Sequence, residues 1–277
     1  MRHGKIIYTV ENIGSLTFGV DGSFRLISFD GTSLGATILT NTGINRAGQQ
    51  TSRVTLKSRT IPCELAVKGI DNEGRYSYEI LDKLKQEICK IINPLYQGTL
   101  TRVNRYGTYS IKVRPSEIPT FEKVVGAVSK FKVNFVADNP MWKDIKTRTY
   151  YIGGAYGTNL KIYNTLGAEL PFVFKGVAQS GDGIFTLTQE ETGERIALGS
   201  GDFFRVGDWE FLLDTDTGEV KTRKPNETEF TSGDFLFDFQ SAIDMVLKPG
   251  QNTFTLSSDN ADAVFTIEVT DMYVGVS

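Results

Sequence analysis

Histidine and cysteine are scarce in this chain of 277 residues. It holds one histidine, His3, and two cysteines, Cys63 and Cys89. A Ser-His-Asp triad and a histidine-rich zinc site both need more histidine than this chain offers. Two cysteines cannot build a disulfide framework, and we expect both to be free thiols of small core residues. The sequence therefore predicts no enzyme, no metal site and no cofactor.

Long apolar runs are also missing. No run approaches the roughly 18 residues of a membrane span. Residues 1–10 contain a two-residue apolar stretch before polar residues return, whereas a secretory signal needs about 7–15 apolar residues. We therefore expect a protein that is made in the cytoplasm, with no membrane insertion.

Positive charge predominates in the first half of the chain and negative charge in the second half. Residues 1–150 carry 22 Lys and Arg against 13 Asp and Glu, whereas residues 151–277 carry 8 against 20. The asymmetry predicts two domains with different surroundings. A basic half suits nucleic acid or an acidic partner. Its cations are scattered singly, however, which favours ordinary solvated faces over a nucleic-acid site.

Residues 1–150 are predicted to hold strands and one helix. Apolar and polar side chains alternate in the segments that we expect to be strands: Leu26–Phe29, Arg53–Lys57, Cys63–Lys68, Tyr109–Arg114 and Lys130–Val136. Over Tyr76–Ile92 the apolar residues instead recur at steps of three and four, which predicts an amphipathic helix ended by Asn93-Pro94. We expect this helix to pack on the sheet rather than to bind a partner.

Residues 151–277 show short strands and no helix. The expected strands, separated by Gly, Asn and Asp turns, are Leu160–Tyr163, Pro171–Phe174, Ile184–Thr188, Arg195–Leu198, Trp209–Leu213, Phe235–Phe239, Thr253–Leu256 and Ala263–Val269. About eight strands with regular turns predict an antiparallel sandwich. The segment Phe235–Phe239 is apolar on both faces, which indicates a central strand or one covered by a neighbouring subunit.

Three motifs could indicate a ligand-binding or catalytic site, but for each of them we favour a structural role. Asp214–Glu219 resembles the start of a calcium loop, but cations follow where carboxylates are needed, so we predict a hairpin turn. Gly153–Gly157 lacks the Lys-Ser/Thr and helix of a phosphate loop, and we interpret it as an interdomain joint. A glycosidase carboxylate pair would come from Glu190, Glu191, Glu194, Asp202 and Asp208, which we instead expect in acidic turns.

The order of these pieces resembles the distal tail proteins of long-tailed, siphovirus-type bacteriophages and prophages. The most specific part is Phe131–Trp142, a phenylalanine-bearing strand followed by Asp-x-Pro-x-Trp before the domain joint. Further cues are the single helix, Gly98–Leu100, Gly201-Asp202, Asp214–Gly218 and the turn Leu247–Asn252. The resemblance implies a ring-forming N-terminal tail domain over residues 1–150 and a galectin-like β-sandwich over residues 151–277.

Such a protein is a structural component of the virion tail, at the tail tip or baseplate. The resemblance implies a hexameric ring that joins the tail tube protein to the tail-associated fibre hub and receptor-binding apparatus, with transient DNA passage through its lumen. The alternative is a carbohydrate-binding sandwich that attaches to the host surface. That alternative needs an exposed aromatic platform, and neither Trp142, in the joint, nor Trp209, in a strand, is an obvious one.

Overall fold

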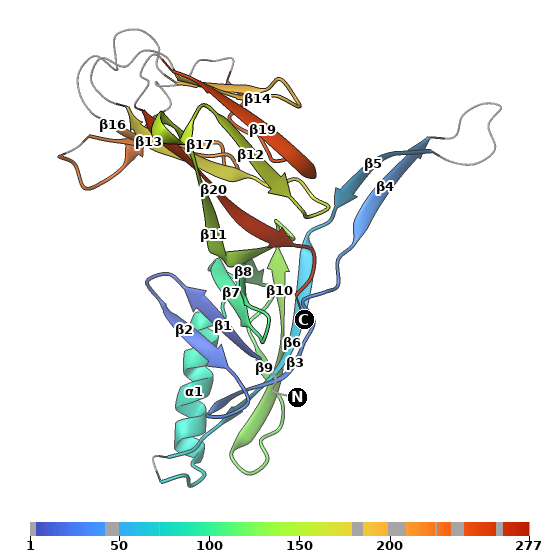
Figure 1. The fold of residues 1–277 in the computed structure, drawn as a ribbon. Helices are drawn as coiled ribbons and strands as arrows, with labels where there is room; N and C mark the ends of the chain where they lie inside the picture. Colours follow the sequence, from blue (N-terminus) through green and yellow to red (C-terminus); the bar gives the residue numbers. More distant parts are fainter. Residues whose placement is uncertain are drawn as a thin grey trace. The chain divides into compact units, whose positions relative to one another are not determined.

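The computed structural model describes residues 4–41, 50–71, 73–178, 185–198, 209–224, 226–233, 241–258 and 263–276. Within these residues the chain consists of antiparallel strands and one α-helix, which confirms the predicted mainly β fold (Figure 1). It divides into two compact units, unit 1 with Met1–Ile145 and Met272–Ser277, and unit 2 with Lys146–Asp271. Unit 1 thus includes the last residues of the chain, which the expected division at residue 150 assigns to the second domain.

Unit 1 is built on a sheet of antiparallel strands in the order β3-β6-β10-β8-β7-β1-β2. The strands are β1 (Lys5–Val10), β2 (Gly14–Phe18), β3 (Phe24–Phe29), β6 (Arg59–Lys68), β7 (Gly98–Val103), β8 (Thr108–Pro115) and β10 (Val128–Ala137). Two further strands join this sheet: the short β9 (Thr120–Phe121) pairs with β10, and the start of β11 (Trp142–Gly153) pairs with β8.

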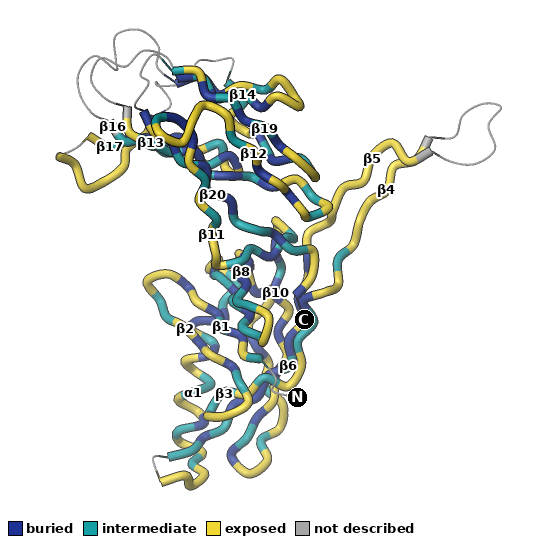
Figure 2. The backbone as a smooth tube through the Cα atoms, viewed as in Figure 1, coloured by how far each residue is buried: buried dark blue, intermediate teal, exposed yellow. Residues whose placement is uncertain are grey.

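Alternation along each strand builds the core of unit 1. In β10, Phe131, Val133 and Phe135 are buried, whereas Lys130 and Lys132 are exposed. Because β6 pairs with β10 over its whole length, Cys63 and Leu65 add to the same buried layer. Figure 2 shows the resulting alternation of buried and exposed backbone positions along these strands.

Helix α1 (Tyr78–Ile91) covers part of this core. Its buried side chains Leu81, Ile88 and Ile91 recur on one face, as predicted, and the helix packs against β2 and β6. Ser77 caps its start, since the Ser77 hydroxyl accepts a hydrogen bond of 3.4 Å from the backbone N–H of Ile80.

A second, two-stranded sheet in unit 1 consists of β4 (Ala36–Asn41) and β5 (Gln50–Leu56). We call these two strands the arm. The arm leaves the main sheet after β3 and returns directly into β6, and its base is joined by a hydrogen bond of 2.9 Å from the Lys57 N–H to the Gly35 carbonyl. Figure 1 shows the two strands running away from the rest of unit 1.

Unit 2 consists of two antiparallel sheets, as expected for a sandwich. One sheet has the order β18-β17-β16-β13-β20-β11 and the other β12-β19-β14-β15. Rings of opposite sheets meet between them: Phe172 contacts Phe254, and Phe185 contacts Phe265, with centroids 5.6 and 4.8 Å apart. The strands are β12 (Asn159–Asn164), β13 (Phe172–Ala178), β14 (Phe185–Gln189), β15 (Arg195–Leu198), β16 (Trp209–Asp214), β17 (Glu219–Arg223), β18 (Thr231–Ser232), β19 (Gly250–Ser257) and β20 (Val264–Tyr273).

Candidate assembly surfaces

The arm is exposed on both of its faces. Every described side chain from residue 36 to 40 and from 51 to 58 is exposed (Figure 2). Ala36 pairs with Leu56 and Ile38 with Val54, so these four apolar side chains share one face. Ile38 is 59% exposed and Val54 55%. Such a ribbon leaves its apolar side chains exposed, which makes it a candidate surface for contact with another molecule.

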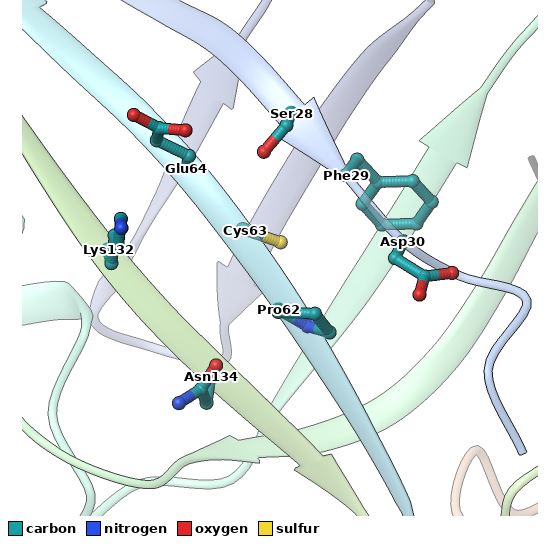
Figure 3. A pocket seen from close by; sticks show the side chains of 8 residues that line it. All are labelled: Ser28, Phe29, Asp30, Pro62, Cys63, Glu64, Lys132 and Asn134. Atoms are coloured by element: carbon teal, nitrogen blue, oxygen red, sulfur yellow. The ribbon is translucent and has the colours of Figure 1, made fainter.

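A groove of about 320 Å³ lies on the main sheet of unit 1, where β3, β6 and β10 run side by side (Figure 3). Phe29 and Pro62 give it an apolar part, and Asp30, Glu64 and Lys132 give it charge. Glu64 is opposite Lys132 in the strand register. The groove therefore combines a small apolar floor with two carboxylates and one ammonium group.

Asp30 is held in the ionised form by its neighbours. Its carboxylate accepts hydrogen bonds from the Ser33 hydroxyl at 2.6 Å and from the backbone N–H and hydroxyl of Thr32 at 2.9 and 2.7 Å. These bonds, that from the Ser33 hydroxyl above all, hold the pKa of Asp30 far below its usual range. The groove thus keeps a fixed negative charge at this end.

The carbonyl of Gly31 anchors the end of the chain. It accepts hydrogen bonds from Arg59 Nη1 at 2.6 Å, from Trp142 Nε1 at 3.1 Å and from the Val276 N–H at 3.1 Å. Arg59 also donates through Nη2 to the Val274 carbonyl. Trp142 is fully buried and begins β11, so the prediction that it lies in a turn is wrong, although unit 1 ends soon after it, at Ile145.

A second arginine of unit 1 is buried nearby. The Arg102 guanidinium lies 4.8 Å from the centroid of the Phe29 ring, and its Nε and Nη1 have no hydrogen-bond partner among the described residues. Burial lowers the pKa of both Arg59 and Arg102 from the ordinary value for arginine. Burying a charged side chain costs free energy of folding unless other groups interact with it. Backbone carbonyls do so for Arg59, and the face of the Phe29 ring does so for Arg102.

The predicted hairpin turn at Asp214–Glu219 is present between β16 and β17. The N–H of Gly218 donates to the Asp214 carbonyl at 2.8 Å, and Gly218 has a φ of 68°.

The described part of the chain holds no group of three or more His, Cys, Asp or Glu side chains placed to bind a metal. It also holds no helix long and apolar enough to cross a membrane.

Gly153–Gly157 does not join the two units. The segment lies within unit 2, where it links β11 to β12 through a short 3₁₀ turn at Gly154–Tyr156. The glycines at 153, 154 and 157 all have positive φ, so their role is to turn the chain. The interpretation as an interdomain joint is therefore wrong.

The acidic residues weighed as a glycosidase pair are engaged in local contacts. Glu191 accepts hydrogen bonds of 2.8 and 2.9 Å from the Thr253 N–H, Glu190 accepts one from the Thr255 hydroxyl, and Glu194 one from the Thr192 hydroxyl. Asp202 and Asp208 lie outside the described residues, as do Phe235–Phe239 and the side chain of Trp209.

Sequence reasoning missed an aromatic pair on unit 2. The rings of Tyr151 and Tyr156 stack with centroids 5.0 Å apart and an interplanar angle of 20°. Tyr151 is 47% exposed and Tyr156 61%. The spacing of two tyrosines across a glycine turn could have indicated the pair, because the turn folds residue 156 back towards 151.

Part of unit 1 matches the model of a known family. Residues 11–137 match the model of the phage tail protein RIFT-related domain. This segment of the chain is similar to a phage tail domain. This match, which spans most of the main sheet together with α1 and the arm, supports the resemblance to distal tail proteins that the sequence indicated.

Solved structures extend the likeness to phage tail proteins to nearly the full length of this chain. The crystal structure of the Dit protein (gp 19.1) of phage SPP1 superposes with a TM-score of 0.69 at 15% identity, over 97% of this chain and 99% of that chain. A chain of the phage P2 baseplate in its activated conformation with Ca gives a TM-score of 0.55 at 13% identity, covering 100% of both. At such identities the likeness is one of fold, and it confirms the expected resemblance. Comparison with curated proteins returns no match.

Proposed function

We propose that this protein is a structural hub component of a siphophage-type tail. In this proposal six copies form a ring through unit 1. The ring joins the tail tube protein to the tail-associated fibre hub, and DNA passes through its lumen during infection. The protein belongs to the virion, is assembled in the host cytoplasm, and makes no covalent chemistry.

One observation carries the proposal: a phage tail domain in residues 11–137 lies within a chain whose whole fold follows that of the SPP1 Dit protein. That protein is described as a paradigm of the hub adsorption apparatus of phages that infect Gram-positive bacteria. The exposed arm adds independent support, because a protein that assembles must present surface that its own fold does not use.

The cations of unit 1 gather in a way that suits an anionic neighbour. Lys112 and Arg114 of β8 and Lys130 and Lys132 of β10 are all exposed, and the strand register puts them on the same face of the sheet. We place this face towards the lumen or an acidic partner surface, since clustered cations attract polyanions over several ångströms.

The mass of the assembled particle tests the ring. Mass photometry of the purified chain is expected to give a species of six copies, and negative-stain averages of that species are expected to show sixfold rings. The purified tail tube protein, when added, is expected to bind to one face of the ring. A stable assembly of another copy number, or filaments that do not close, would contradict the proposal.

A second candidate function is favoured by the stacked pair Tyr151 and Tyr156 alone. Exposed rings are the surface on which sugar rings pack, so unit 2 would bind host glycans through them. Binding to cell-wall polysaccharide of the host that is abolished by Tyr156→Ala, with the exposed Tyr163→Ala as the control, would support it. Equal binding by both variants would reject it.

A further inference from the structure

Four neighbouring strands of the main sheet of unit 1, β3, β6, β10 and β8, carry almost only positive charge on their outer face. The side chains that alternate with the buried ones along these strands include six cations: Arg25, Lys68, Lys112, Arg114, Lys130 and Lys132. Glu64 is the one acidic residue in the four strands, all of whose residues are described. We call this outer face, with its six cations, the basic face.

The strand register brings cations of the basic face close together. Arg25 pairs with Ala66 and Ala66 with Lys130, so these three residues form one row across β3, β6 and β10. Neighbouring strands are about 4.8 Å apart, and side chains two residues apart on one face of a strand are separated by about 7 Å. Lys132 follows Lys130 at that spacing, and Lys68 lies two residues from Ala66. Each of these four cations therefore has another within about 10 Å, which is close to the Debye length at physiological salt.

The cations of the basic face lack ionic partners within the described residues. None of the six forms an ion pair there. Glu64 is opposite Lys132 in the register, and the Glu122 N–H donates to the Lys130 carbonyl at 2.8 Å, yet neither carboxylate pairs with a lysine. Unpaired cations at this spacing repel one another and hold counterions, so an anionic partner that displaces the counterions is favoured.

The composition of the basic face suits phosphate better than an acidic protein. Lysine is depleted, and aromatic residues are enriched, at protein–protein interfaces. Four of the six cations here are lysines, and no aromatic side chain of the four strands is exposed. Contacts to phosphate need only lysine and arginine side chains that reach the nucleic-acid backbone.

We propose that the basic face binds duplex nucleic acid through its phosphates, independently of base sequence. The inference rests on the proposed function, in which DNA passes this protein, and names the surface that contacts the DNA. Phosphates of one DNA strand follow one another at about 3.4 Å along the helix axis, so Lys130 and Lys132 are spaced by about two phosphates. Lys112 and Arg114 continue the contact along β8.

The salt dependence of binding tests the contact. Fluorescence anisotropy with a labelled duplex of about 20 base pairs is expected to show binding by the purified chain, and two duplexes of unrelated sequence are expected to bind within about threefold of each other. With four phosphates neutralised, the logarithm of the affinity falls with the logarithm of the salt concentration at a slope of about −3.6. Affinity should therefore drop roughly a hundredfold between 50 and 200 mM salt.

Substitutions on β10 assign the binding to the basic face. Lys130→Gln/Lys132→Gln is expected to make the slope shallower by about 2, and Lys130→Glu/Lys132→Glu to weaken binding more than about tenfold at low salt. The matched control Lys83→Glu/Lys90→Glu makes the same change of net charge at exposed positions of α1 and is expected to weaken binding less than about threefold. All four positions are exposed, so the melting temperatures should stay close to that of the wild type.

The outcomes separate this inference from the proposed ring. Equal loss of affinity in the two charge-reversal variants would show an effect of net charge alone and overturn the inference. Polyglutamate of the same total charge that binds as tightly as the duplex would assign the face to an acidic protein and overturn it too. Rings that bind no duplex overturn the inference and leave the ring standing, whereas a chain that binds the duplex as expected but forms no ring overturns the ring alone.

Discussion

Tyr8 brings a hydroxyl group into the core of unit 1 without a partner. The side chain is fully buried, its ring lies 4.8 Å from that of Phe135, and its hydroxyl has no hydrogen-bond partner among the described residues. A buried polar group without a partner costs stability, because it loses its bonds to water and gains none in return.

Replacement of Tyr8 by Phe is expected to stabilise the protein. The change keeps the ring contact and removes the unsatisfied hydroxyl, so the free energy of unfolding should rise by about 1 kcal/mol in urea titrations. As the control, Tyr163→Phe on the exposed surface should change it by less than about 0.5 kcal/mol. A loss of more than about 1 kcal/mol in Tyr8→Phe would mean that the hydroxyl is bonded after all.

Two buried groups make stability fall at high pH. Burial raises the pKa of Tyr8 from 10.0 to about 12, against a smaller lowering by Arg114, and it raises that of Cys63 from 9.0 to about 12. Between their ordinary and raised values the unfolded chain releases protons that the folded chain retains. The stabilisation is therefore complete below about pH 9 and is lost as the pH rises through about 12.

Denaturation midpoints measured from pH 8 to 11 check this dependence. The wild-type midpoint should fall over that range, and the fall should be shallower in Tyr8→Phe and in Cys63→Ala, each compared with its own value at pH 8. Equal slopes in all three proteins would contradict the assignment to these two groups.

Among the elements, α1 depends on its cap. The Ser77 hydroxyl satisfies one of the backbone N–H groups that the first turn leaves without an intrahelical partner. We expect Ser77→Ala to lower the free energy of unfolding by about 1 kcal/mol, measured by thermal or urea denaturation, and Ser77→Asp to restore it. Equal stability of the Ala and Asp variants would show that the bond, at 3.4 Å, contributes nothing.

Elements with a strong local pattern were predictable, and the others were not. The helix expected over Tyr76–Ile92 is observed at Tyr78–Ile91, and the strand expected over Lys130–Val136 at Val128–Ala137. Strands β1 and β2 were not expected, although Ile6, Tyr8 and Val10 alternate, because a six-residue strand carries a weak signal. Strand β11 was missed since its middle is polar and exposed.

At the scale of the whole molecule, the C-terminal residues of the chain belong to unit 1, as do its N-terminal residues. The Val274 carbonyl accepts a hydrogen bond from Arg59, the Val276 N–H donates to the Gly31 carbonyl, and the Val276 side chain is buried in the unit 1 core. Unit 1 is therefore discontinuous in sequence, and residues near position 275 stabilise strands formed by residues near 30 and 60.

Deletion of residues 274–277 is expected to destabilise unit 1 by about 2–4 kcal/mol, because it removes two hydrogen bonds and leaves more of the buried Arg59 charge without a partner. Hydrogen exchange followed by mass spectrometry should then show faster exchange in β3 and β6, with β14 and β19 of unit 2 unchanged. Val274→Ser keeps the backbone carbonyl and serves as the control, with an expected change below about 0.5 kcal/mol. Uniformly faster exchange in both units would contradict a local anchor.

The candidate surfaces were beyond prediction from sequence. Arg53–Lys57 was recognised as a strand, but its alternation is that of an ordinary half-buried strand, and nothing in it indicates that both faces are exposed. The groove is formed by three strands, β3, β6 and β10, that are neighbours in the sheet although other elements separate them in the chain. Exposure and concavity depend on which segments become neighbours, and that is a property of the folded chain.

Local pattern by itself determined the class of this protein: strands of period two, one helix of period near 3.6, two regions of opposite charge, and a likeness to phage tail proteins. These features depend on residues close in sequence, whose side chains share a face by backbone geometry alone. Tertiary structure decided that Trp142 is buried, that Val276 returns to Gly31, and that the described side chains of the arm are exposed on both faces. Each of these depends on contacts between residues distant in sequence, which the backbone period of a segment does not encode.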